Sequence, residues 1–320
     1  LSSLLSREAL FLFNNLLFMG ILVVCFWGIN YPILSELLTN EKKTIAAPFY
    51  ESAAGPLFAG LLLLMGIAPL SAWGHSSIKT LRRTILKPLL VSLAGPLIAG
   101  LAGVRSAIAL LAFWLTALVI CVTLYEYGRA ALTRHRLQSE SLPLALWHLA
   151  RHNRRRYGGY IIHLGVTFMA LGIIGIEMFQ TQTEGLLKPG QSLKLAGYSV
   201  TYQSLAQFDT PDQRNVARAV VSVEKNGRSL GELYPRRDYY YESNQPVTLP
   251  GVRSSMEDDL YVVLVNWKPI SAEGATFKVY HNPLVNWLWL GGLVFILGTL
   301  VAAWPAPEKD RPRAGEPEGK

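Results

Sequence analysis

One histidine stands alone inside a long apolar stretch. His163 lies in the run YGGYIIHLGV, residues 157–166. An ionisable group within a segment long enough to cross a bilayer is costly there, and it usually faces the helix bundle or a partner. A neutral imidazole is also a good ligand for haem iron or a transition metal. His163 is therefore a candidate ligand of a haem iron or a transition metal.

The surroundings of His163 allow two interpretations. The same segment contains five glycines, which leave room for a neighbouring helix or a flat cofactor: Gly158, Gly159, Gly165, Gly172 and Gly175. His163 also lies only four residues from the expected cytoplasmic edge. At about 1.5 Å per residue, it is roughly 6 Å deep, where an imidazole can reach headgroups or water. The residues alone leave both interpretations open.

A second candidate is a polar segment rich in arginine and tyrosine, ELYPRRDYYYESNQP, residues 232–246. Arginine forks bind carboxylates such as haem propionates, and tyrosine rings add planar stacking surface. Arg236, Arg237, Tyr239 and Tyr240 are thus candidates for a haem or partner contact. The alternative is an ordinary polar strand whose arginines and tyrosines pair across a sheet.

The sequence contains no motif for hydrolytic or phosphate-binding chemistry and no cysteine pattern typical of a disulfide or zinc site. The remaining histidines are expected at interfaces or in loops, and there is no HExxH motif and no glycine-rich phosphate loop. Cys25 and Cys121 lie in apolar runs without a CxxC motif, which argues against a disulfide framework or a zinc cluster. No metal site other than haem iron at His163 is predicted, and the catalytic residues stay unassigned.

The composition points to a bilayer. The chain is 51% hydrophobic and only 16% charged, whereas soluble domains carry about 25% charge. The net charge is +8, but the basic residues gather at the ends of apolar runs, as orientation in a membrane requires. A nucleic-acid partner is therefore not expected.

Six apolar segments are long enough, or nearly so, to cross a hydrocarbon core of about 30 Å. They are residues 10–29, 53–73, 88–101, 107–125, 159–178 and 284–304. Only five residues separate the third from the fourth, which predicts a helical hairpin. Basic residues crowd the second-to-third and fourth-to-fifth connections, and positive charge stays on the cytoplasmic side. Both termini are then cytoplasmic, and residues 179–282 are outside.

The outer region predicts β-structure. Tyr198, Val200 and Tyr202 alternate with polar residues, which indicates a half-buried strand. The dipeptide Asn226-Gly227 is a hairpin-turn signal, and residues 260–265 form an apolar run typical of a buried strand. The fold class is therefore a polytopic α-helical membrane protein, with about six transmembrane helices and a small β-rich extracytoplasmic domain between the last two.

The predicted organisation has four parts. Residues 1–178 form a helical region with a basic cytoplasmic loop at 126–158, and residues 179–282 form the β-rich domain. Residues 283–304 form the final helix. Residues 305–320 are a charged tail that cannot bury enough apolar surface to fold.

Several motifs together resemble one family. The segments are SREALFLFNN (6–15), YGGYIIHLG (157–165), LYPRRDYY (233–240), EDDLYV (257–262) and NPLVNWLWLGG (282–292). In this order they look like the C-terminal half of the CcmF/CycK family, the large membrane subunit of the cytochrome c maturation (System I) haem lyase. The likeness spans nearly the whole chain.

The resemblance implies a function and partners. The family attaches haem to apocytochrome c by thioether bonds at a CxxCH motif, takes haem from the chaperone CcmE and works with CcmH and CcmI. It also holds a b-type haem between two transmembrane histidines, and one of these falls on His163. Haem b as cofactor, haem as substrate and a multi-pass bacterial inner-membrane location with a periplasmic β-domain are thus expected. A mitochondrial inner membrane is the alternative.

The chain also departs from the family pattern. The tryptophan-rich WWD segment, its flanking histidines and the second transmembrane ligand belong to the family's N-terminal half. Trp287 and Trp289 lie in a membrane span and are not that segment. We therefore expect either a piece of a longer protein or one polypeptide of a split protein. Nitrite-reductase assembly homologues resemble the family as well.

Three functions compete. The first is a component of a cytochrome c synthase. The second is a non-catalytic membrane scaffold that docks haem-lyase partners. The third is a transporter, which needs intramembrane charges or broken helices along a pathway. The spans contain Pro56, Pro69 and Pro96 but almost no charge, which ranks the transporter last.

Overall fold

The computed structural model describes residues 6–71, 78–267 and 274–305. The chain forms two compact units. The first comprises Leu1–Phe168 and Leu290–Lys320, and the second comprises Met169–Trp289. Each unit is described by itself below.

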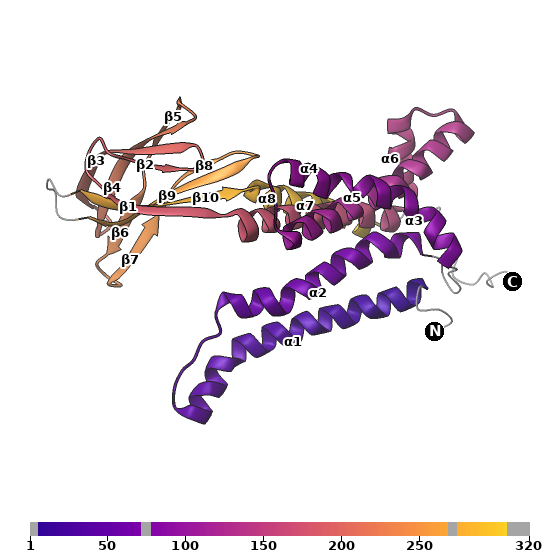
Figure 1. Cartoon of the computed structure of the whole chain (residues 1–320), viewed down its shortest axis with the longest axis horizontal. Coiled ribbons are helices and arrows are strands. Elements are labelled where there is room, and N and C mark those ends of the chain that lie inside the picture. The colour runs from indigo at the N-terminus through magenta and orange to yellow at the C-terminus, as the bar shows by residue number, and fades with distance from the viewer. Residues whose placement is uncertain (1–5, 72–77, 268–273, 306–320) are drawn as a thin grey trace. The chain divides into compact units, whose positions relative to one another are not determined.

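Helices build the first unit (Figure 1). They are α1 (Arg7–Thr39), α2 (Ala47–Ile67), the short 3₁₀ helix η1 (Ala68–Leu70), α3 (Ile78–Ser92), α4 (Ala94–Leu101), α5 (Ala107–Gln138), α6 (Leu142–His152), and the parts of α7 (Arg154–Phe179) and α8 (Val285–Ala303) that fall within it. Ser6 accepts a hydrogen bond from the Ala9 amide at 3.3 Å, and Ser106 accepts one from the Ala109 amide at 3.4 Å. These caps set where α1 and α5 begin.

In the described part of the chain, six helical segments are long and apolar enough to cross a membrane, which confirms the predicted six transmembrane helices. They are Arg7–Thr39, Ala47–Leu70, Arg82–Leu101, Ala107–Gln138, Arg154–Phe179 and Val285–Ala303. On α1, large apolar side chains such as Leu16 and Phe26 are 65% exposed. Such exposure of apolar surface suits contact with lipid or with another membrane protein.

The third segment is broken into α3 and α4. Pro96 has no amide hydrogen to donate to the Ser92 carbonyl, and its ring crowds that carbonyl. The helix is interrupted at Leu93 as a result. Both α3 and α4 pack on α5, and a Cβ placed on Gly95 would lie 2.7 Å from the Ala117 Cβ. The predicted helical hairpin is thereby confirmed.

Residues 126–158, expected as a basic loop, are largely helical. The α5 helix continues to Gln138, and α6 follows after three residues. Tyr127 donates its hydroxyl hydrogen to the Leu146 carbonyl at 3.0 Å, which fastens α6 to α5. Alanine, leucine and arginine favour helix, so this connection is basic without being irregular.

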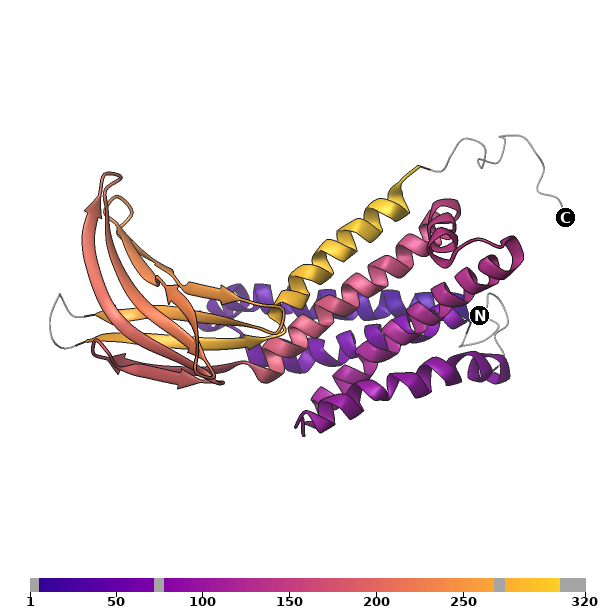
Figure 2. The same ribbon diagram turned by 90° about the horizontal axis from the view of Figure 1, so that it is seen from above.

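Ten antiparallel strands form two sheets in the second unit (Figure 2). A four-stranded sheet has the order β1 (Thr181–Leu187), β10 (Ala275–Pro283), β9 (Asp258–Trp267), β8 (Gly251–Ser254). The other has the order β2 (Ser192–Leu195), β3 (Tyr198–Thr210), β4 (Arg214–Lys225), β6 (Arg236–Tyr240), β7 (Gln245–Leu249), and β5 (Arg228–Leu233) pairs with β4.

The core of the second unit lies between these sheets. Tyr198, Val200 and Tyr202 are buried, as their alternation predicts, and they join β9 and β10 residues in one apolar cluster. On β9, Leu260, Val262 and Leu264 are fully buried while the residues between them are half-buried. The predicted strand is confirmed, with burial on alternate positions. Asn226 and Gly227 have positive φ and form the predicted β4–β5 hairpin turn.

The predicted disordered tail at 305–320 lies outside the described residues, except for Pro305.

Candidate ligand site on helix α7

His163 sits on α7, nine residues after the helix begins at Arg154. Its side chain is half-buried. Its Nδ1 atom is buried and has no hydrogen-bond partner among the described residues. Thr167 donates its hydroxyl hydrogen to the His163 carbonyl at 2.6 Å, so that hydrogen is not available to the ring. A buried, unsatisfied imidazole nitrogen is uncommon and needs an explanation.

Another helix packs closely against glycines on α7. In the first unit, Gly158 lies against Ala302, and a Cβ placed on Gly165 would come within 2.5 Å of the Phe295 nitrogen. The glycine face is therefore occupied by α8. At about 100° per residue, His163 lies about 140° from Gly158 around the helix, so the imidazole is on another face.

The face that carries His163 packs against α5. Arg156 donates to Glu126 at 3.3 Å, and the rings of Tyr127 and Tyr157 are 4.9 Å apart between centroids. Glu126 is only 4% exposed, so this ion pair is shielded. Arg156 also donates to the Tyr160 hydroxyl at 3.1 Å. These contacts fix both the depth and the rotation of α7 relative to α5.

The donor set suits a haem better than a free metal ion. No group of three or more His, Cys, Asp or Glu side chains that could hold a metal ion occurs in the described part of the chain. A structural zinc or similar ion needs about four such ligands. A haem iron needs only one or two axial ligands, and a single imidazole such as that of His163 can fill one of these positions.

The arginine–tyrosine segment forms β6, and its side chains divide between two faces. Arg236 and Tyr240 lie on the same face as Asp238, which is fully buried. Arg236 is 3.5 Å from Asp238, Arg214 donates to Asp238 at 2.8 Å, and the Arg214 guanidinium lies 5.6 Å from the Tyr240 ring centroid. For Arg236 and Tyr240, the geometry matches the alternative of pairing within the sheet.

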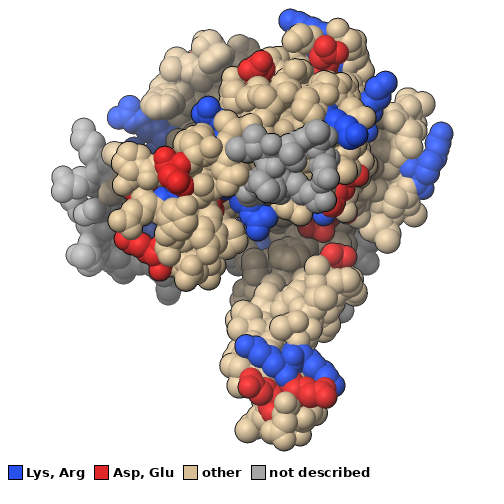
Figure 3. Space-filling model, turned by 90° about the vertical axis from the view of Figure 1, so that its left-hand side faces the viewer, with Lys and Arg blue, Asp and Glu red and all other residues tan. Residues whose placement is uncertain are grey.

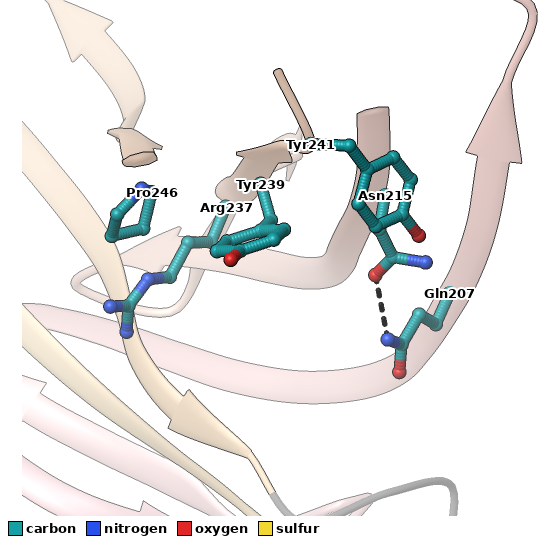
Figure 4. Close-up of a pocket in the computed structure, with 6 residues that line it drawn as sticks. All are labelled: Gln207, Asn215, Arg237, Tyr239, Tyr241 and Pro246. Atoms are coloured by element: carbon teal, nitrogen blue, oxygen red, sulfur yellow. Dashed lines mark hydrogen bonds between the residues drawn. The ribbon is translucent and has the colours of Figure 1, made fainter. Parts of the chain in front are cut away.

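Arg237 and Tyr239 point to the opposite face and line a shallow pocket of about 500 Å³ (Figure 4). The other lining residues are Gln207, Asn215, Tyr241 and Pro246. The rings of Tyr239 and Tyr241 meet edge to face, with centroids 5.8 Å apart. Arg237 donates to the Val265 carbonyl at 2.7 Å, which holds its guanidinium in place. Of the four predicted residues, these two therefore share a concave surface.

Charge on the outer surface is mixed. On the face shown in Figure 3, Lys and Arg side chains are interspersed with Asp and Glu side chains. A nucleic-acid interface requires a continuous basic patch.

A polar cluster around Asp258 was not anticipated from the sequence. Tyr198 donates to Asp258 at 2.8 Å, Lys225 at 2.9 Å, and the His281 Nε2 atom is 2.9 Å from the same carboxylate. Burial alone raises the pKa of Asp258, but hydrogen bonds from Lys225, Tyr198 and His281 outweigh burial and hold this pKa at about 2. His281, expected as a surface residue, is thus part of this cluster.

The neighbouring turn anchors the start of α8. Asn286 donates to Asp259 at 2.7 Å, and the Trp287 indole donates to the Met256 carbonyl at 3.1 Å.

The motif EDDLYV carried one signal for the polar cluster around Asp258, namely two adjacent carboxylates at the start of a strand. Its partners come from residues up to 60 positions away, and sequence spacing does not bring them together.

Six membrane-length helices interrupted by a β-sandwich define an integral membrane protein. Residues 178–283 match the family model described as the CcmF C-terminal beta-sandwich. The chain is 28% identical over 302 residues to the cytochrome c-type biogenesis protein CcmF of Pseudomonas fluorescens, covering 94% of this chain and 44% of that protein. It is 30% identical over 301 residues to the cytochrome c-type biogenesis protein ccl1 of Rhodobacter capsulatus, covering 93% and 44%.

A solved structure is also similar. The fold matches that of the cytochrome c heme lyase CcmF with a TM-score of 0.77 and 27% identity, covering 95% of this chain and 46% of that one. The predicted resemblance to the C-terminal half of the CcmF family is therefore confirmed. The chain spans about 44% of the length of the curated relatives it matches. Its six apolar helices and its bacterial relatives indicate a protein of the bacterial inner membrane.

Proposed function

We propose that this chain is a subunit of a cytochrome c haem lyase and that His163 is one axial ligand of a transmembrane b-type haem. In this role the chain helps to attach haem to apocytochrome c through thioether bonds at a CxxCH motif. The observation that supports the proposal is the buried, unpaired Nδ1 atom of His163 within a membrane-length helix, in a chain similar to CcmF proteins.

The chain's own residues would prepare the ligand. Packing of α5 against one face of α7 and of α8 against the glycine face holds His163 at a fixed depth. The Nδ1 atom of His163 is buried, and a neutral imidazole is the form that binds iron. A bound b-type haem supplies electron exchange, with a potential set by its axial ligands and their hydrogen bonds.

The second ligand and the haem-handling surface are expected from a polypeptide that corresponds to the N-terminal half of CcmF. The proposed partners are that polypeptide, CcmH- and CcmI-like proteins, the haem chaperone CcmE and apocytochrome c. Basic residues along the α5–α7 connection favour a cytoplasmic position for it, which supports a periplasmic β-sandwich. Arg237 and Tyr239 are proposed to contact a partner or haem through their shared pocket.

The test is spectroscopic. Co-expression with the N-terminal half of a CcmF protein should give a low-spin b-type absorbance spectrum in purified complexes. His163→Ala should abolish that spectrum, and His148→Ala should preserve it, because His148 instead pairs with Glu140 at 3.0 Å. If His163→Ala left the spectrum unchanged, the ligand assignment would be wrong.

The scaffold remains a second candidate because the pocket at Arg237 and Tyr239 is a concave surface independent of His163. Co-purification of CcmH-like proteins with a complex that has no haem spectrum would favour the scaffold. Loss of both would argue against either function.

A further inference from the structure

Three buried polar atoms in the first unit have neither a hydrogen bond nor an ion pair among the described residues. They are Trp114 Nε1, Thr123 Oγ1 and His163 Nδ1. Thr123 is fully buried on α5, and His163 lies on α7. Unpaired buried polar atoms are rare, since each forfeits its hydrogen bonds to water. Two of them on neighbouring helices suggest a common purpose.

Thr123 departs from the behaviour of other helical threonines here. A threonine in a helix commonly donates its hydroxyl hydrogen to the carbonyl four residues earlier. Five threonines in the helices of this unit do so, at 2.6 to 2.9 Å: Thr39, Thr116, Thr133, Thr167 and Thr299. Thr123 has no such bond. Its hydroxyl therefore retains its full capacity to accept or donate elsewhere.

The contacts between α5 and α7 place Thr123 near the depth of His163. The two helices run antiparallel and side by side (Figures 1 and 2), and Glu126 meets Arg156 at 3.3 Å. Thr123 comes three residues before Glu126 on α5, and His163 comes seven residues after Arg156 on α7. Because the helices are antiparallel, both residues lie on the same side of the Glu126–Arg156 pair. At about 1.5 Å per residue, Thr123 is about 4.5 Å and His163 about 10.5 Å from that pair along the helix axes. Their axial separation is thus about 6 Å.

Their side chains also lean toward each other. Helical side chains tilt toward the N-terminus of their own helix, and these termini are at opposite ends of the antiparallel pair. At about 100° per residue, Thr123 lies about 40° from Tyr127, and His163 lies about 20° from Arg156 around their helices. Tyr127 and Arg156 are contact residues of the α5–α7 interface. Both polar groups therefore lie on the faces that meet.

We propose that Thr123 is a positioning residue for His163: the Thr123 hydroxyl accepts the His163 Nδ1–H hydrogen through one bridging water. This inference rests on the proposed function. A ligating histidine almost always donates its second ring N–H to a partner, which fixes the tautomer and ring orientation and raises ligand basicity. The Thr116 and Thr167 hydroxyls are already bonded to backbone carbonyls, whereas the Thr123 hydroxyl has no partner among the described residues. One bridging water has polar partners on both sides.

The test uses the co-expressed complex and three variants. Thr123→Val removes the hydroxyl at nearly constant shape, Thr123→Ser keeps it, and Thr116→Val is the matched control on the same helix. Thr123→Val should retain the low-spin spectrum, because Nε2 still binds iron. Without its hydrogen bond, the His163 imidazole is less basic and stabilises ferric iron less. The reduction potential of the haem in this variant should therefore rise, and haem should bind about tenfold more weakly. Thr123→Ser and Thr116→Val should match the unaltered complex.

The outcomes separate this inference from the proposed function. An unchanged potential and haem affinity in Thr123→Val would overturn the positioning role and leave His163 as a ligand. An equal change in Thr116→Val would also overturn it, because the effect would then be one of packing. If His163→Ala kept the haem spectrum, the proposed function itself would fail. Should Thr123→Val not accumulate, Thr123→Ala gives the same comparison.

Discussion

The two units treat buried polar groups differently. In the second unit, Asp258 is only 7% exposed, and its carboxylate forms hydrogen bonds with Tyr198, Lys225, His281 and Ser255. In the first unit, Thr123 is fully buried, and its hydroxyl has no partner among the described residues. Satisfied groups stabilise a fold without help. The Asp258 cluster in the sandwich is thus satisfied by its own neighbours, whereas buried atoms such as Thr123 Oγ1 and His163 Nδ1 have no hydrogen-bond partner among the described residues.

Apolar side chains show the same contrast. Phe277 in the sandwich core is fully buried, whereas Leu16 on α1 is 65% exposed. The sandwich gains its stability from its own interior. The helices depend on lipid or on neighbouring membrane proteins to cover their surfaces. Three substitutions test this contrast, beginning with the largest expected effect.

Phe277→Ala should destabilise the second unit by about 3–5 kcal/mol, because it leaves a cavity in a closed core. Thermal unfolding of the purified chain in detergent, followed by the β-sheet circular dichroism signal, measures the change. Leu16→Ala is the matched control and should move the midpoint little. A large effect of Leu16→Ala would show that α1 is packed against something the described residues do not include.

Asp258→Asn should change how stability depends on pH. The pKa of Asp258 is held at about 2, below the ordinary aspartate value of 3.8, so its contribution of about 2 kcal/mol is present above pH 4. That contribution is lost as the pH falls from 4 toward 2, because the unfolded state then binds the proton more readily. The variant should lack this loss when unfolding is measured across that range. Glu242→Gln, at an exposed carboxylate of the same unit, is the control.

Gly165→Ala should destabilise the α7–α8 packing by about 1–2 kcal/mol, since one added methyl overpacks the contact. That methyl would lie 2.5 Å from the Phe295 nitrogen, whereas nothing lies within 4 Å of one added at Gly159. Gly159→Ala should therefore be tolerated. Equal midpoints for the two variants in a thermal aggregation assay would contradict the close packing of these helices.

The fold was largely accessible from the sequence because its signals are local. Apolar runs of membrane length predicted six spans, and period-two alternation at Tyr198, Val200 and Tyr202 predicted a core strand. The helical character of residues 126–158 was missed, since a density of basic residues says little about backbone conformation. The break at Leu93 depends on Pro96 and could have been inferred from that residue alone.

The candidate site was accessible only in part. His163 stands out by residue type, because an imidazole in an apolar run is unusual. Thr123 carries no such mark, since threonine is ordinary in a helix and only its missing back-bond distinguishes it. Arg236 and Tyr240 lie on one face of the sheet and Arg237 and Tyr239 on the other, because successive side chains of a strand point to opposite faces. It could have been predicted once that segment was assigned to a strand.

The most direct test replaces His163 with glycine in the co-expressed complex and then supplies imidazole. We expect His163→Gly to lose the low-spin b-type spectrum, and we expect millimolar imidazole to restore it by occupying the vacated ligand position. A His163→Gly complex that kept the low-spin spectrum without imidazole would contradict the account.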